Sequence, residues 1–182
     1  MKRTVRSIVI LICIVASGLP ACAQRTSEPI VSPTVVMVVR HAEKAADQGS
    51  DPSLTEAGQA RAQSLIEVAG DAGVTAIYSS QFKRTQETVA PLAAHLGLTV
   101  TTVEISGANL AAYPAMLAEQ ILTDHRGETV VVVNHSNTVP LIVEALGGVA
   151  VAEITEEEYD HFFVVVVPAS GPVQTIRAQY GR

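Results

Sequence analysis

The chain has 182 residues, of which 48% are hydrophobic and 16% are charged. This length and composition suit one globular domain with a substantial core and give no sign of a second domain. The formal net charge of −6 argues against a nucleic-acid partner, because a polyanion is bound by a basic surface.

Residues 1–23 have the pattern of an export signal. Lys2, Arg3 and Arg6 precede an apolar run over residues 8–16. This run is shorter than the roughly 20 apolar residues that a membrane-spanning helix needs. We therefore expect a cleaved secretory signal and an exported protein.

Two cleavage sites are compatible with this signal. The segment LPAC resembles a bacterial lipobox, which would leave a lipidated Cys22 and a membrane-anchored envelope lipoprotein. Cleavage after Ala23 would instead release a soluble periplasmic protein. We favour the lipoprotein, because Cys22 is otherwise unexplained. Residues 24–33 then form a tether, and the folded body has no cysteine for a disulfide or a metal site.

Apolar, β-branched runs alternate with helical patterns from residue 34 onwards. The predicted strands are Val35–Val39, Ala76–Tyr78, Thr99–Val103, Thr129–Val133, Phe162–Val167 and Val173–Arg177. The first predicted helix starts near a cap at Ser53 or Thr55 and ends at Gly70 or Gly73. Three further helices are predicted over Lys83–Leu96, Leu110–Asp124 and Thr138–Leu146. This order predicts an α/β three-layer sandwich with a mostly parallel sheet, as one domain over residues 34–182.

Polar residues follow three of the predicted strands at the point where each strand ends. Arg40 and His41 follow the first strand, Asn134 and His135 follow the fourth, and Arg84 comes shortly after the second. Ligands of parallel α/β sheets bind beyond the carboxyl ends of the strands. We therefore expect these side chains to meet at one edge of the sheet.

Two imidazoles and two guanidinium groups suit a phosphoryl group. The planar forks of Arg40 and Arg84 match phosphate oxygens. A neutral His41 could attack phosphorus and form a phosphohistidine, since nearby arginines disfavour its protonation. His135 could donate to the phosphoryl oxygens as charge develops in the transition state.

Four segments resemble, in order, the motifs of the histidine phosphatase superfamily, whose fold is that of phosphoglycerate mutase. They are VVRHAEK, LTEAGQARAQSL, IYSSQFKRTQET and VVVVNHSNTV, and the resemblance covers about residues 34–167. It implies a phosphohistidine enzyme, and the short segment between Glu104 and the third predicted helix favours a small phosphatase. It assigns His41 as the nucleophile and Arg40, Arg84 and His135 as the phosphate-binding residues around it.

The chain departs from the family pattern at two places. Asn134 stands where the family usually has glycine, and its side chain is expected either to crowd the pocket or to add a hydrogen bond. The family's general acid corresponds best to Glu104, although the surrounding motif is missing; Glu43 is the weaker candidate.

The resemblance implies hydrolysis of a small-molecule phosphate ester or a phosphopeptide, without a cofactor. A metal site built from His41, Glu43 and His135 is disfavoured by the cations beside it, so no metal is expected. Two alternatives stay open. One is a phosphotransferase like phosphoglycerate mutase, and the other is a non-catalytic envelope lipoprotein that binds phosphorylated ligands.

Other polar residues are expected to be structural. Residues 156–158, three consecutive glutamates, are expected to form an exposed turn. Thr85 and Thr88 are expected to pack within or cap their helix, and Lys83 to be solvated.

Overall fold

The computed structural model describes residues 32–46 and 49–181. The predicted signal over residues 1–23, with Cys22, and residues 24–31 of the predicted tether lie outside the described residues. All described residues belong to one compact unit. Within these ranges, every helix is too short or too polar to cross a membrane.

A six-stranded sheet forms the centre of this unit. Its strands are β1 (Thr34–Arg40), β2 (Val74–Ser79), β3 (Val100–Thr102), β4 (Thr129–Asn134), β5 (His161–Val167) and β6 (Gln174–Gln179). In space the order is β3-β2-β4-β1-β5-β6. The first four strands in this order are parallel, and β5 and β6 are antiparallel to their neighbours. This confirms the predicted, mostly parallel sheet.

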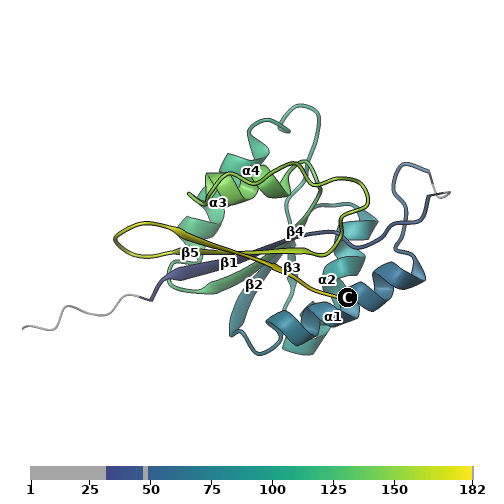
Figure 1. Ribbon diagram of the computed structural model, residues 1–182, viewed down its shortest axis with the longest axis horizontal. Coiled ribbons are helices and arrows are strands. Elements are labelled where there is room, and N and C mark those ends of the chain that lie inside the picture. The colour runs from purple at the N-terminus through teal and green to yellow at the C-terminus, as the bar shows by residue number, and fades with distance from the viewer. Residues whose placement is uncertain (1–31, 47–48, 182) are drawn as a thin grey trace, which may run out of the picture. The chain divides into compact units, whose positions relative to one another are not determined.

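Helices cover both faces of the sheet. The helices are α1 (Glu56–Ala69), α2 (Lys83–Leu96), α3 (Tyr113–Asp124) and α4 (Val139–Ala145). Figure 1 shows α3 and α4 on one side of the sheet and α1 and α2 on the other. The predicted three-layer α/β sandwich is therefore the observed fold.

The valine runs explain why the two central strands are covered on both sides. Alternate residues of a strand point to opposite faces. In β4, Val130 and Val132 belong to the core cluster that includes Leu117 of α3, whereas Val131 and Val133 belong to the cluster that includes Leu65 of α1. A strand buried on both faces needs apolar residues at every position, as this segment has.

The helix ends follow local chemistry. Of the two predicted caps, Thr55 is the one used: its hydroxyl accepts a hydrogen bond from the Gly58 backbone at 3.1 Å. Gly97 ends α2 in the left-handed conformation, with φ of 67°. Helix α3 begins at Tyr113 instead of Leu110, because residues 107–112 form turns and Pro114 has no N–H to donate to the Leu110 carbonyl.

Gly58 allows α1 to approach the loop that follows β1. A Cβ atom at this position would lie 2.3 Å from the carbonyl oxygen of Glu43. The backbone amide of Thr55 donates to that same carbonyl at 2.9 Å. The helix therefore holds the loop directly after His41.

Candidate active site

The carboxyl ends of three neighbouring parallel strands bring the predicted residues together. Arg40, the last residue of β1, is the register partner of Asn134, the last residue of β4. The next residue along β1, His41, donates its backbone N–H to the Asn134 carbonyl at 2.8 Å. As a result, the rings of His41 and His135 lie 5.5 Å apart between centroids.

His41 is held as a neutral imidazole with one free nitrogen. Its side chain is 3% exposed, and Nδ1 lies 2.8 Å from the Ala42 carbonyl, to which it must donate. Burial, supported by the charges of Arg40 and Arg84, lowers the pKa of His41 to about 3. Nε2 therefore carries the lone pair, has no hydrogen-bond partner among the described residues, and is the ring nitrogen available to the pocket that His41 lines.

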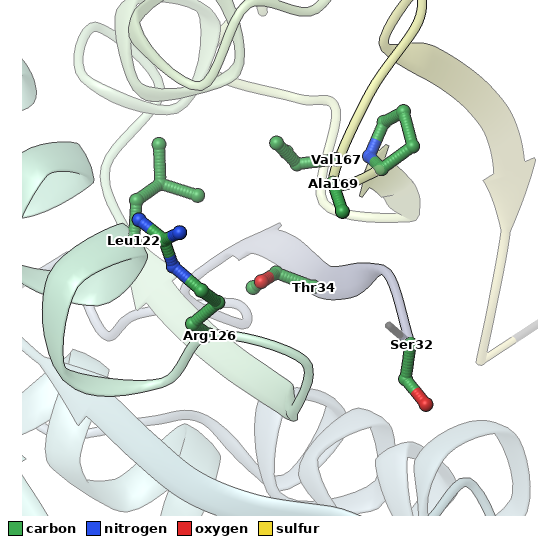
Figure 2. A pocket seen from close by; sticks show the side chains of 7 residues that line it. Ser32, Thr34, Leu122, Arg126, Val167 and Ala169 are labelled. Atoms are coloured by element: carbon green, nitrogen blue, oxygen red, sulfur yellow. The ribbon is translucent and has the colours of Figure 1, made fainter. Parts of the chain in front are cut away.

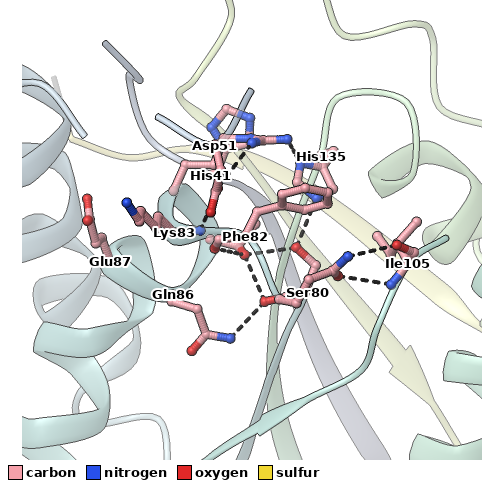
Figure 3. Close-up of polar contacts among 12 residues, drawn as sticks. His41, Asp51, Ser80, Phe82, Lys83, Gln86, Glu87, Ile105 and His135 are labelled. Atoms are coloured by element: carbon pink, nitrogen blue, oxygen red, sulfur yellow. Dashed lines mark hydrogen bonds and ion pairs between the residues drawn. The ribbon is translucent and has the colours of Figure 1, made fainter. Parts of the chain in front are cut away.

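His135 is fixed through both ring nitrogens. Nδ1 lies 3.3 Å from an Arg84 NH2 group and Nε2 lies 2.9 Å from the Ser80 hydroxyl. Arginine only donates, so Nδ1 accepts and Nε2 carries the proton that it donates to Ser80. Figure 3 shows Ser80 directed at His135, with Phe82 beside the His135 ring. Burial, followed by the charge of Arg84, lowers the pKa of His135 to about 3.

Arg84 comes from the first turn of α2. Its guanidinium lies 4.5 Å from the Phe82 ring centroid, and NH1 is 3.8 Å from Asp51. Its Nε is buried without a hydrogen-bond partner in the described part of the chain. Arg84 therefore has an unused donor beside His135.

Arg40 is fully buried and does not line the open pocket. NH1 donates to the carbonyls of Thr155 and Glu158, and the guanidinium lies 4.1 Å from the Tyr159 ring centroid. NH2 is 3.4 Å from the Glu156 carboxylate, but neither NH2 nor Nε makes a hydrogen bond within residues 32–46 and 49–181. A buried donor without a partner is costly, so these two groups indicate an anion site.

The pocket in front of the two histidines has a volume of about 450 Å³. It is lined by His41, Lys44, Phe82, Arg84, Ile105, Leu110, His135, Ser136, Asn137, Thr138, Glu153 and Glu156. The pocket lies beyond the carboxyl ends of β1, β2 and β4, as predicted. His41, Arg84 and His135 line it together, whereas Arg40 reaches only Glu156 of this lining, at 3.4 Å.

Glu156 is a site residue that the sequence reasoning missed. Its side chain is 65% exposed, which fits the expected turn, yet it also lies 3.2 Å from Lys44 and 3.4 Å from Arg40. These contacts, first among them the hydrogen bond from Lys44, lower the pKa of Glu156. No local pattern indicates this role, because Glu156 reaches the site from the loop before β5. Lys44 could have been predicted as a site residue, since it lies three residues after His41 in the sequence.

The two candidate general acids lie away from the reacting centre. Glu43 forms a bidentate ion pair with Arg61, with a shortest distance of 2.7 Å, and so anchors the loop after His41 to α1. Glu104 is exposed and does not line the pocket, whereas its neighbour Ile105 does. The role of Glu104 stays a prediction that this geometry does not support.

Asn134 adds hydrogen bonds and does not enter the pocket. Its amide nitrogen donates to the Tyr113 hydroxyl at 2.8 Å, and its amide oxygen accepts from the His135 backbone at 3.1 Å and from the Thr138 hydroxyl. The question raised by the missing glycine is thus answered. The side chain points towards α3 and fixes the backbone that carries His135.

A second pocket, of about 200 Å³, lies at the opposite end of β1 (Figure 2). It is lined by Ser32, Thr34, Leu122, Arg126, Val167, Pro168 and Ala169. None of the predicted catalytic residues lines it. Among the described residues, no group of three or more histidine, cysteine or carboxylate side chains is arranged to hold a metal ion.

Comparisons with known proteins agree with this fold. The family model of the histidine phosphatase superfamily (branch 1) matches residues 36–105. A mycobacterial glucosyl-3-phosphoglycerate phosphatase is similar in structure, with a TM-score of 0.60 and 16% identity, over 82% of this chain and 99% of that chain. The protein histidine phosphatase SixA, solved with tungstate, has a TM-score of 0.60 and 18% identity, over 80% of this chain and 96% of that chain.

A phosphoserine phosphatase from Entamoeba histolytica, in complex with 3-phosphoglyceric acid, is also similar. Its TM-score is 0.54 at 16% identity, over 75% of this chain and 95% of that chain. A search of curated proteins found no match.

Over residues 36–105 the chain matches the model of the histidine phosphatase superfamily, and its fold is similar to that of the solved phosphatases above. This match supports phosphatase or phosphoryl-transfer chemistry in general.

Proposed function

We propose that the protein hydrolyses phosphomonoesters through a phosphohistidine on His41. The observation that carries this proposal is a set of unused groups at the carboxyl end of β1 and the start of α2. Buried Arg40 and half-buried Arg84 retain guanidinium N–H donors without hydrogen-bond partners in the described chain, and their charges act on His41, whose neutral ring has a free Nε2. Donors that lack a partner and a nucleophile with a lone pair together favour an electrophilic anion as ligand.

The reaction has two displacements. In the first, Nε2 of His41 forms a bond to phosphorus as the bond from phosphorus to the ester oxygen breaks, and the leaving group departs as an alcohol after taking up a proton. In the second, water attacks the phosphohistidine and releases inorganic phosphate and His41. Arg40 and Arg84 neutralise the equatorial oxygens in both steps.

His135 acts as a donor once the phosphate is bound. In the free protein its Nδ1 accepts from Arg84. A phosphate dianion favours protonation of the ring, after which Nδ1–H donates to a phosphoryl oxygen and Nε2–H still donates to Ser80. Arg84 is then released to direct its N–H groups to the phosphate.

His41→Ala tests the nucleophile. We expect turnover of an aryl phosphate to fall to background, with no acid-labile phosphoenzyme trapped by quenching, while the far-ultraviolet circular dichroism is unchanged. His95→Ala is the matched control, because His95 is exposed near the end of α2 and should retain full activity. Retained turnover in the His41 variant would refute the assignment.

The same experiment separates hydrolysis from the two alternatives. Labelled phosphoenzyme should lose its phosphate to water in the absence of any acceptor. A mutase would require transfer to a hydroxyl acceptor, and a non-catalytic binding protein would form no phosphoenzyme at all. Glu104→Gln measures the remaining prediction: a general acid at this position should lower turnover by at least about 100-fold.

The substrate is proposed to be a small phosphate ester or a phosphopeptide. The structural neighbours are named as phosphatases of glucosyl-3-phosphoglycerate, of protein histidine and of phosphoserine, which supports a range of phosphorylated substrates. We also propose export, with a lipid on Cys22. Labelling of the wild type with a radioactive fatty acid, and its loss in Cys22→Ser, would distinguish an anchored protein from one cleaved after Ala23.

A further inference from the structure

The two walls of the active-site pocket differ in chemistry. One wall is apolar and consists of Phe82, Ile105 and Leu110. Phe82 packs against His135, with ring centroids 5.2 Å apart. The backbone of Ile105 is clamped by the Gln81 side chain through hydrogen bonds of 2.7 and 2.9 Å. This wall is thus a fixed surface that suits the carbon skeleton of a leaving group.

The lining also includes an acidic wall, which consists of Glu153 and Glu156. The two glutamates flank Ile154, which is 4% exposed and anchors the segment in the core. Glu156 is paired with Lys44 and lies near Arg40. Glu153 lines the same pocket but has no ion pair or hydrogen bond among the described residues. One carboxylate of the wall is therefore available to a ligand.

The positions of these charges separate the two ends of a substrate. Arg40, Arg84 and Lys44 lie around the catalytic histidines and offset the charge of a phosphate dianion. Glu153 is an exposed residue of the pocket lining and takes part in none of the ion pairs around that centre. Opposite charges attract and like charges repel over several ångströms, and at an exposed site salt screens this interaction. A leaving group with a second anion is disfavoured there, and one with a cation is favoured.

We propose that the pocket selects phosphate monoesters whose leaving group combines an apolar body with a cationic amine. The apolar body lies against Phe82 and Leu110, and the amine lies at Glu153. This inference rests on the proposed function, because the unpartnered Nε2 of the buried His41 fixes where the phosphoryl group must be. It also predicts discrimination against leaving groups that carry a carboxylate or a second phosphate.

Three aryl phosphates that differ at one position test the charge. They are 4-(aminomethyl)phenyl, 4-(hydroxymethyl)phenyl and 4-carboxyphenyl phosphate. We expect kcat/KM to fall in this order, with steps of about 2- to 5-fold at low ionic strength, the range of a partly exposed ion pair. Each step should shrink at high salt, because salt screens the interaction.

Variants of Glu153 separate recognition from the different leaving abilities of the three phenols. Glu153→Gln should remove most of the preference for the amine over the alcohol, and Glu153→Lys should place the carboxylate ester first. Glu157→Gln and Glu157→Lys are the controls, because Glu157 is an exposed neighbour outside the pocket lining. An unchanged order of substrates in Glu153→Lys, or an equal change in Glu157→Lys, would overturn the proposal.

The apolar wall has its own test. Leu110 is 42% exposed at the pocket, and Leu141, which is 48% exposed on α4, does not line it. Leu110→Ser should raise KM for the aminomethylphenyl ester by about 3-fold or more, but leave KM for 2-aminoethyl phosphate unchanged. Leu141→Ser should alter neither. An equal effect of Leu110→Ser on both substrates would contradict a role of this wall in binding the apolar body.

Binding measurements keep this inference distinct from the proposed hydrolysis. The non-hydrolysable 4-(aminomethyl)phenylphosphonate and 4-carboxyphenylphosphonate can be titrated calorimetrically against the wild type and Glu153→Lys. Tighter binding of the amine, reversed in the variant, would support the selection even if no ester were hydrolysed. Hydrolysis of all three esters without preference would instead leave the phosphatase intact and refute the selection.

Discussion

Asn134 takes a place where glycine is usual in the family, and its amide holds three partners at once. It donates to Tyr113 and accepts from the backbone of His135 and from Thr138. All of these groups are buried. The residue therefore links α3 to the end of β4 and positions the second histidine from behind.

Asn134→Gly should destabilise the protein by about 2–3 kcal/mol, because it leaves buried polar groups without partners. It should also lower kcat more than it raises KM, since the role proposed for His135 is to donate to the phosphoryl group in the transition state. Urea denaturation and steady-state kinetics measure the two effects. Tyr113→Phe removes only one hydrogen bond and should reduce the free energy of unfolding and kcat less than Asn134→Gly does. If Asn134→Gly changed neither quantity, the hydrogen bonds of the amide would have no role in stability or activity.

If phosphate binds as proposed, Glu156 competes with it for the cations of the site. Its carboxylate lies 3.2 Å from Lys44 and 3.4 Å from Arg40. Glu156→Gln should therefore strengthen inhibition by inorganic phosphate by about 2- to 5-fold, a modest effect because the side chain is largely exposed. Inhibition constants at low salt measure this, with Glu157→Gln as the control. Weaker inhibition would mean that Glu156 organises the cations and does not compete for them.

At the scale of elements, the contact between α1 and the loop after β1 sets the position of His41, the proposed nucleophile. Glu43 accepts through its backbone from Thr55 and through its side chain from Arg61. Its carbonyl also fills the space that a side chain at Gly58 would need. Ala42, between Glu43 and His41, donates to Thr88 of α2 at 2.9 Å. Two helices thus fix the loop that orients the His41 ring.

Gly58→Ala tests this contact. In an open helix the change would stabilise the protein by about 1 kcal/mol. Here the Cβ atom would lie 2.3 Å from the Glu43 carbonyl, so we expect a net loss of at least about 1–3 kcal/mol and a lower kcat. Gly107→Ala is the control, since no atom lies within 4 Å of a Cβ there. If Gly58→Ala unfolded at the same temperature as the wild type, this would contradict the close approach of α1 to the Glu43 carbonyl.

Much of the element pattern was readable in the sequence, because it depends on local chemistry. Continuous valine in β1 and β4 indicated strands covered on both faces, and Gly97 ended α2 where expected. The meeting of His41, Arg84 and His135 followed from the rule that parallel strands share an edge. Glu156 and the partners of Asn134 could not be foreseen, since they depend on loop paths and side-chain directions that no local pattern encodes.

At the scale of the whole molecule, the two buried histidines connect stability to pH. Burial lowers the pKa of His41 and of His135 to about 3, below the usual value of about 6.5. Between these values the unfolded chain binds protons that the folded protein does not. The contribution of these two histidines to the free energy of unfolding should therefore fall as the pH drops below about 6.5, and this contribution stops changing near pH 3.

The slope of this loss approaches about 1.4 kcal/mol per pH unit for each histidine. Urea denaturation at pH 7, 6, 5 and 4 measures it. The double variant His41→Gln, His135→Gln should show a shallower dependence over the same range, because only its other titrating groups, such as Glu43, still contribute. An identical slope in the double variant would show that other groups dominate the acid sensitivity.

The two edge strands of the sheet, β3 and β6, affect the tendency of the protein to aggregate. β3 has only three residues, and β6, with the sequence QTIRAQ, is largely polar and exposed, with Ile176 as its one large apolar side chain. Short or polar margins offer little for a foreign strand to join. The wild-type protein should therefore stay free of aggregation at high protein concentration. Arg177→Val, which makes the edge strand β6 more hydrophobic, should precipitate under the same conditions.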